Sequence, residues 1–220
     1  MNTSDGLDAV IAAVHVGRAR PLGPEGVLSG FIKNAQSGRV AVHELGLEGD
    51  EQVDLRVHGG PDKAVYGYAV SNYTGWRADF PEHAALFAPG GVGENLALVG
   101  LDEGSVCIGD VHAIGTALLV VCQPRQPCYK FALRFDDKRV VHAMVSNGRS
   151  GWYYRVRREG TVAAGDVVQR IERPNPAWTV ARFVAGAARR RFSAAEWAEL
   201  AVMTGLAEQW RDVARRRVGT

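Results

Sequence analysis

Cysteine is scarce in this chain, and its scarcity narrows the chemistry that the chain can carry. The 220 residues include three cysteines, Cys107, Cys122 and Cys128. An odd number without paired spacing argues against a disulfide framework. The five residues between Cys122 and Cys128, with no second Cys or His pair after them, do not match a structural zinc site. We therefore expect reduced thiols in a cytoplasmic protein.

Long apolar runs and a strong charge of one sign are also missing. No apolar run approaches the ~20 residues that a membrane-spanning helix needs, and the polar residues 1–6 do not resemble a signal peptide. The net charge of +2 gives no argument for binding nucleic acid. Arginines gather near the end, where residues 175–220 hold eight Arg against four acidic residues. We expect them on solvated helix faces and helix C-termini, with contact to an acidic partner as the alternative.

The first 174 residues have the pattern of one β-rich domain. Short β-branched runs alternate with turns such as Gly109-Asp110 and Gly165-Asp166, which favours a barrel or sandwich over a parallel sheet. Apolar side chains at helical spacing predict one helix over Lys63–Trp76, with Pro61 in its first turn. Strands are expected at residues 10–16, 39–45, 94–99, 105–108, 111–114, 117–122, 152–157 and 167–172.

The pattern changes at Pro174-Asn175-Pro176, after which three helical segments are expected. Thr179 is a suitable cap for the first, and Ser193-Ala194-Ala195-Glu196 has the form of a capping box for the second. Helices this short are marginal alone, so their apolar faces must pack together or against the body. The predicted fold class is α+β, mainly β, with a β-barrel-like domain over residues 1–174 and a small α-helical domain over residues 175–220.

The segment from Gln123 to Lys130 presents one thiol on a stiff, electropositive loop. It follows the apolar run at 117–121, so a buried strand is expected to end there, and its two prolines oppose a simple continuation of the ladder. Arg125 and Lys130 flank Cys128, and nearby cations favour thiolate over thiol. Cys128 is therefore a candidate nucleophile or soft-metal ligand. The alternative is a small apolar residue packed at a turn.

Three other segments bring cations or glycines that suit an anion. Glycine lets the backbone approach a ligand and lets N–H groups converge on it, and His58-Gly59-Gly60 precedes an expected helix N-terminus. Neither glycine cluster matches a P-loop or a dinucleotide fingerprint, so turn geometry and a structural histidine stay as alternatives. The segments are Phe31-Ile32-Lys33-Asn34, residues 46–63 and Pro89-Gly90-Gly91-Val92-Gly93-Glu94-Asn95-Leu96.

Taken together, these segments resemble the MOSC domain, the molybdenum-cofactor sulfurase C-terminal family, and in particular its YiiM-type members. The resemblance covers nearly the whole chain, and the tail after Pro174 resembles the three-helix extension of those members. It rests on Lys33, Gly46-Leu47-Glu48-Gly49-Asp50, His58-Gly59-Gly60-Pro61-Asp62-Lys63-Ala64-Val65, Gly93-Glu94-Asn95-Leu96, Gln123-Pro124-Arg125-Gln126-Pro127-Cys128, Gly151-Trp152-Tyr153 and Arg173-Pro174.

The resemblance implies a β-barrel-like domain with peripheral helices that binds the molybdenum cofactor, a molybdopterin carrying Mo. Cys128 matches the family's single cysteine and would be both the molybdenum ligand and the catalytic residue. The other implied cofactor-binding residues would surround the cofactor's phosphate and pterin. They are Lys33, Arg56, His58, Gly59, Asn95 and Arg125.

The resemblance also implies a reaction and its partners. YiiM-type proteins are implicated in reducing N-hydroxylated base analogues with electrons from a separate flavoprotein reductase and without pyridoxal phosphate. The expected partners are thus a small N-hydroxylated substrate and that reductase, with neither nucleic acid nor membrane, and a homodimer is compatible with the sequence. Tyr129, Trp152 and Tyr153 are candidates to stack on a flat substrate, with packing in the core or at the rim as the alternative.

Three other hypotheses stay open at this stage. Cys128 could bear a persulfide in a non-catalytic carrier of sulfur or cofactor. It could act with His58 as a metal-free nucleophile pair. The arginine-rich tail could make the chain a pure interaction domain.

Overall fold

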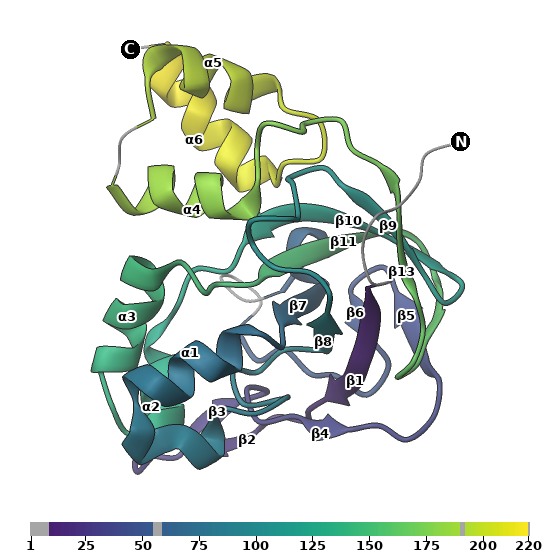
Figure 1. Ribbon diagram of the computed structural model, residues 1–220, viewed down its shortest axis with the longest axis vertical. Helices are drawn as coiled ribbons and strands as arrows, with labels where there is room; N and C mark the ends of the chain where they lie inside the picture. Colours follow the sequence, from purple (N-terminus) through teal and green to yellow (C-terminus); the bar gives the residue numbers. More distant parts are fainter. Residues whose placement is uncertain (1–8, 55–58, 190–191, 220) are drawn as a thin grey trace.

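A curled eight-stranded sheet forms the body of the molecule (Figure 1). The computed structural model describes residues 9–54, 59–189 and 192–219. The strands of this sheet are β1 (Val10–Val16), β4 (Asn34–Ala35), β7 (Val65–Ala69), β8 (Leu96–Val99), β9 (Val111–Ile114), β10 (Ala117–Pro124), β11 (Trp152–Arg158) and β13 (Val168–Glu172). Their order is β13-β9-β10-β11-β7-β8-β1-β4, and every neighbouring pair is antiparallel except β7 and β8.

The sheet bends until β13 and β1 meet, which gives it a barrel-like shape. Val10 at the start of β1 forms an antiparallel bridge with Val167, and the Val168 N–H donates to the Ala9 carbonyl at 2.7 Å. The right-handed twist of strands favours such curling, and closure pairs edges that would otherwise be open. The predicted barrel-like, mainly β body is confirmed. Beside it lie two smaller sheets, β12 (Gly160–Val162) with β5 (Val40–His43) and β6 (Gly46–Leu47), and β2 (Arg20–Leu22) with β3 (Val27–Ser29).

The segment predicted as a helix over Lys63–Trp76 is a strand followed by a shorter helix, so that prediction was wrong. All five residues of β7 are buried. A strand covered on both faces has a continuous apolar run, which periodicity alone cannot distinguish from a buried helix. The β-branched and aromatic side chains of Val65, Tyr66 and Tyr68 favour the strand. The flanking elements are a 3₁₀ turn, η1 (Pro61–Lys63), and the helix α1 (Asn72–Asp79).

Most other strand predictions are confirmed. Strands β1, β5, β8, β9, β11 and β13 lie within one or two residues of their predicted bounds. Residues 105–108 do not form a strand, because Cys107 makes only an isolated bridge with Thr179. Strand β10 runs to Pro124 rather than ending at Cys122, since a register shift between Val121 and Gln123 lets it continue opposite β11.

Two further helices have no predicted counterpart, α2 (Tyr129–Phe135) and α3 (Arg139–Asn147). They lie with α1 on one side of the sheet (Figure 1), together with the 3₁₀ segment η2 (Pro81–Leu86). The space between them is filled by aromatic rings, and Trp76 stacks on Phe87 with 5.0 Å between ring centroids. The buried aromatic members of this cluster are Tyr66, Tyr68, Tyr73, Trp76, Phe80, Phe87, Phe131 and Phe135.

The tail forms the three predicted helices, α4 (Val180–Arg189), α5 (Ala194–Val202) and α6 (Glu208–Val218), grouped at the top of Figure 1. Thr179 Oγ1 accepts a hydrogen bond from the Arg182 N–H at 3.1 Å, and Ser193 and Glu196 form the capping box. Within the described residues no helix combines the length and apolar character needed to cross a membrane.

The core of the extension is continuous with that of the barrel. Phe183 and Leu206 belong to the same buried cluster as Ile108 and Leu119 of the body. The helical faces pack together and also against the body, so both arrangements that the sequence left open occur.

We expect Phe183→Ala to lower the free energy of unfolding by about 3–5 kcal/mol, because this ring is fully buried among Trp178, Phe192 and Trp210. Since the core is continuous, urea denaturation followed by fluorescence and circular dichroism should show one transition. The control Val202→Ala, whose side chain is 80% exposed, should change this free energy by less than about 0.5 kcal/mol. Separate transitions for helices and barrel would contradict a shared core.

Candidate functional site

A pocket opens beyond the end of β10, beside the loops that precede β7 and β8. With the open solvent at its mouth included, the hollow measures about 690 Å³. Its lining carries more positive than negative charge, which suits an anionic ligand. The positively charged lining residues are Lys33, Lys63, Arg125 and Lys130, and the negatively charged ones are Asp50 and Glu51.

Cys128 lines this pocket and is only partly covered. It is the residue immediately before α2, in an extended conformation, and its thiol does not cap the helix. The sulfur lies close enough to Arg125 and Tyr153 to interact with both electrostatically. Cys107 and Cys122, by contrast, are buried, and burial raises the pKa of both thiols. Of the three cysteines, all within the described residues, Cys128 is the one that a ligand in the pocket can reach.

The guanidinium of Arg125 is held rigidly at the back of the pocket. Its Nη1 donates to the Val92 carbonyl at 2.5 Å and to the Tyr66 hydroxyl at 3.3 Å. The group lies 4.9 Å from the ring centroid of Tyr66 and 5.3 Å from those of Phe31 and Phe131, at cation–π distance. Within the described chain its Nε and Nη2 make no hydrogen bond. They remain available for forked donation to a phosphate or a polar ring.

Lys33 lines the pocket and forms an ion pair with Asp50, which also lines it. Asp50 Oδ1 also accepts from the Gly17 N–H at 2.8 Å, and its Oδ2 accepts from Asn95 Nδ2 at 2.9 Å. Burial lowers the pKa of Lys33, while the Asp50 carboxylate acts in the opposite direction. Because an ammonium group has three N–H donors, this pair still leaves Lys33 able to donate to a ligand.

The side-chain amide of Asn95 is committed to the pocket wall. Its Nδ2 donates to Asp50 and to the His15 carbonyl at 3.1 Å, and its Oδ1 accepts from the Tyr66 N–H at 3.0 Å. Both amide hydrogens are thus used, so Asn95 acts on a ligand mainly by fixing Asp50 and Lys33.

Glycines let the surrounding segments come close to the pocket. A Cβ at Gly30 would lie 2.0 Å from the Glu51 carbonyl oxygen, so only glycine allows these two lining segments to touch. Gly59 lines the pocket as well. The predicted cofactor residues Arg56 and His58 lie outside the described residues.

Asp50 and Lys63 line the pocket but were not among the predicted site residues, whereas Tyr153 was predicted as a candidate to stack on the substrate. Asp50 ends the Gly46-Leu47-Glu48-Gly49-Asp50 motif, and Lys63 follows the Gly-Gly-Pro turn, so both stood in segments that had been singled out. Tyr153 faces the pocket because side chains alternate along β11, which sends Trp152 into the core. Of these two neighbouring candidates, alternation favours Tyr153 once Trp152 is assigned to the core.

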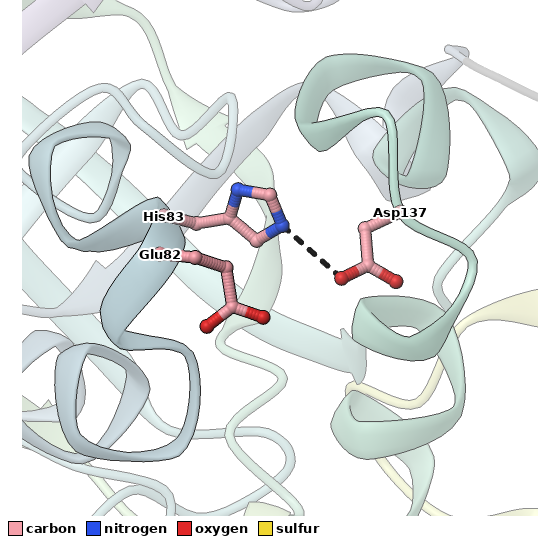
Figure 2. Close-up of side chains that lie close together, drawn as sticks. All are labelled: Glu82, His83 and Asp137. Carbon is pink, nitrogen blue, oxygen red and sulfur yellow. Dashed lines mark hydrogen bonds and ion pairs between the residues drawn. The ribbon is translucent and has the colours of Figure 1, made fainter.

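A second group of metal-ligating side-chain types lies elsewhere, formed by Glu82, His83 and Asp137 (Figure 2). None of them lines the pocket. His83 Nε2 is 3.1 Å from Asp137 Oδ2, and Arg139 donates to Asp137 at 2.7 Å and also to Glu82. Because Arg139 already compensates both carboxylates, the group acts as an ion-pair network that ties η2 to the loop after α2.

The residues of the pocket fit the molybdenum cofactor that the sequence resemblance implies. Cys128 offers a thiolate, a suitable ligand for a soft metal centre. Arg125 and Lys33 offer a forked and a point-like donor for phosphate and pterin. The Glu82, His83 and Asp137 group has no thiol and no excess positive charge, so it fits this cofactor poorly.

Comparisons with known proteins identify the family of this chain. The chain is 39% identical to Protein YiiM of Escherichia coli (strain K12) over 196 residues, which cover 89% of this chain and 87% of that protein. It is 37% identical over 174 residues to a protein of Gibberella moniliformis named "Reductase", covering 78% of this chain and 31% of that longer protein. The crystal structure of YiiM from Geobacillus stearothermophilus superposes with a TM-score of 0.80 at 31% identity, covering 96% of this chain and 99% of that one.

The crystal structure of YiiM from Escherichia coli gives a TM-score of 0.77 at 34% identity and covers 91% of this chain and 92% of that one. The MOSC domain model matches residues 54–169, more than half of the chain. On this match and these relatives, the chain belongs to the MOSC domain family, whose members are associated with the molybdenum cofactor.

Proposed function

We propose that this chain binds the molybdenum cofactor through Cys128 and reduces N-hydroxylated compounds to amines. The observation that carries the proposal is the partly exposed Cys128 thiol in a pocket with excess positive charge, beside the rigid guanidinium of Arg125. A soft ligand next to anion-binding groups suits a metal held by sulfur and carrying a phosphate.

Each lining residue has a distinct part in this proposal. The Cys128 sulfur holds the metal at the wall of the pocket. Arg125 donates from Nε and Nη2 to the polar part of the cofactor, and the three aromatic rings around its guanidinium keep those donors in place. Lys33 supplies a charge to the phosphate, with Asp50 fixing the direction from which it comes.

The bound cofactor supplies two-electron oxygen-atom chemistry. In the overall reaction the N–O bond of the substrate breaks, two electrons and two protons are consumed, and an amine and one water are released. The electrons come from an external flavoprotein reductase. The naming of a 37%-identical relative as "Reductase" supports the class of reaction.

Tyr153 is the candidate to meet a flat substrate, because it lines the pocket. Tyr129, which is 59% exposed, follows Cys128 directly in the chain but does not line the pocket. Burial raises the pKa of Tyr153, so its hydroxyl stays neutral and able to donate a hydrogen bond at physiological pH. Trp152 is fully buried and is assigned to the core.

The first test is the metal content of the protein made in a cofactor-competent host. We expect about one molybdenum per chain in the wild type and loss of most of it in Cys128→Ala, because the ligating sulfur is removed. Elemental analysis with pterin fluorescence measures both parts of the cofactor. The control Cys107→Ala, at a buried thiol outside the pocket, should keep the metal. Equal molybdenum in Cys128→Ala and wild type would overturn the assignment.

The second test is turnover of a small N-hydroxylated purine with a flavoprotein reductase and its electron donor. Wild type should release the amine, measured by chromatography, while Cys128→Ala should fall to the background rate. An intact protein that carries a labile extra sulfur on Cys128 and releases no amine would favour a sulfur carrier instead.

The third test uses pH. Burial lowers the pKa of Lys33 from its ordinary value of 10.5, and a bound phosphate favours the charged ammonium. Affinity for the cofactor should therefore be full well below this pKa and fall as pH rises through it. Molybdenum retained after dialysis from about pH 7 to about pH 10 measures this loss.

Lys33→Gln should retain the cofactor about tenfold less well at neutral pH and should lack this part of the pH dependence, because the ionisable donor is gone. Arg18→Gln, at an exposed position outside the pocket, is the matched control and should behave as wild type. An unchanged pH profile in Lys33→Gln would show that Lys33 does not meet the phosphate.

A further inference from the structure

The helical extension touches the wall of the pocket through the first turn of α6. The Ala207 N–H, at the residue before this helix, donates to the Cys122 carbonyl of β10 at 2.9 Å. The Glu208 N–H, in the first helical position, donates to Asp62 Oδ2 at 2.8 Å. Two successive backbone donors of the extension thus hold a strand and a turn that both lead into the pocket.

Side chains close these contacts into a ring. Gln209 Nε2 donates to Gln123 Oε1, and Gln123 Nε2 donates to the Asp62 carbonyl at 2.8 Å. The path therefore runs from α6 to β10, from β10 to the turn η1, and from η1 back to α6. Gln123 is buried, so loss of one of these bonds would leave a buried polar group without its partner.

The turn that receives these bonds carries pocket residues at both of its ends. Gly59 and Lys63 line the pocket, and both also line a second hollow that Gln123 and Gln209 share. Asp62 is further held by an ion pair with Arg155 of β11.

The turn needs support from outside itself. Gly60 has a φ of +79°, in the region that favours glycine, and glycine leaves the backbone more freedom than any other residue. Among the described residues, the Lys63 N–H donates to the Gly60 carbonyl at 3.0 Å within the turn. Contacts from β10, β11 and α6 to Asp62 supply such support beside Lys63.

We propose that Glu208 and Gln209 are positioning residues of the pocket, which act through Asp62 and Gln123 to hold the turn η1 and its Lys63 against the anionic part of the ligand. The identity of that ligand rests on the proposed function, whereas the mechanical link between α6 and η1 does not. The extension thereby has a part in the site beyond the stability it gives to the core.

The decisive variant is Glu208→Pro, which removes a single backbone donor. Proline is tolerated at the first position of a helix, where the N–H has no partner within the helix. Ala207 already has φ −58° and ψ 139°, the conformation that a residue before proline prefers. The matched control is Glu208→Ala, which loses the same carboxylate with its bonds to Arg211 and Arg215 but keeps the N–H.

Hydrogen exchange tests the link independently of any cofactor. In Glu208→Pro the amides of residues 59–64 should exchange about fivefold faster than in Glu208→Ala, since one hydrogen bond of typical strength is lost, while the amides of α5 should be unchanged. Equal exchange at residues 59–64 in the two variants, with α6 still protected, would overturn the proposal.

Molybdenum retained through gel filtration tests the consequence for the ligand. Glu208→Pro should lose the cofactor faster than Glu208→Ala, and retention equal to that of the control despite faster exchange would overturn the role in binding. A wild type that holds no molybdenum would count against the proposed function, and the exchange result would then decide the positioning role alone.

A second variant, Gln209→Glu, tests the same link in case Glu208→Pro does not fold. Gln209→Glu keeps the shape of the side chain but places an acceptor opposite Gln123 Oε1, so it should reproduce the faster exchange at residues 59–64. Arg216→Gln, at an exposed position of the same helix, should not. Wild-type exchange in Gln209→Glu would contradict the ring of bonds.

Discussion

One buried carboxylate, that of Asp50, joins the segments on which the pocket depends. It accepts from the Gly17 backbone, from Asn95 and from Lys33. An ionised group in such a place is tolerated only while its partners are present, because an unpaired buried charge is strongly destabilising. The contacts that join the chain just after β1 to the chain just before β8 also position the ammonium group of Lys33, so stability and ligand binding are linked at this point.

The thiol side of the pocket is stiffened by different means. Strand β10 stays paired with β11 up to Pro124, and α2 begins immediately after Cys128. Arg125 stands among packed aromatic rings. A ligand group and a cation held in this way need little reorganisation when an anionic metal complex binds, and such preorganisation increases affinity. The pocket therefore has the Lys33–Asp50 ion pair on one side and Arg125 with its surrounding aromatic rings on another.

Local signals made much of the fold predictable. Strand β1 has the bounds that its β-branched run indicates, and α5 begins at the capping box of Ser193. Both signals were readable because each depends only on residues that are neighbours in the sequence. The strand β7 was missed because its burial on both faces comes from distant strands, which no local periodicity records.

The same distinction holds for the site. Cys128, Lys33 and Arg125 stood out by residue type and flanking prolines or glycines, and they do line one pocket. The role of Asp50 could not be assigned from the sequence, because it comes from contacts between segments far apart in the chain. Those contacts exist only once the barrel is formed.

Closure of the barrel affects the order in which the protein folds during synthesis. The strands that meet at Val10 and Val167 lie near opposite ends of the body. Contacts between such distant residues form late, because the long loop between them must first lose its freedom. During synthesis β1 has no partner at this edge until β13 has left the ribosome. The pocket itself draws on residues from Ser29 to Tyr153, so a ligand can enter the complete site only after most of the chain has been synthesised.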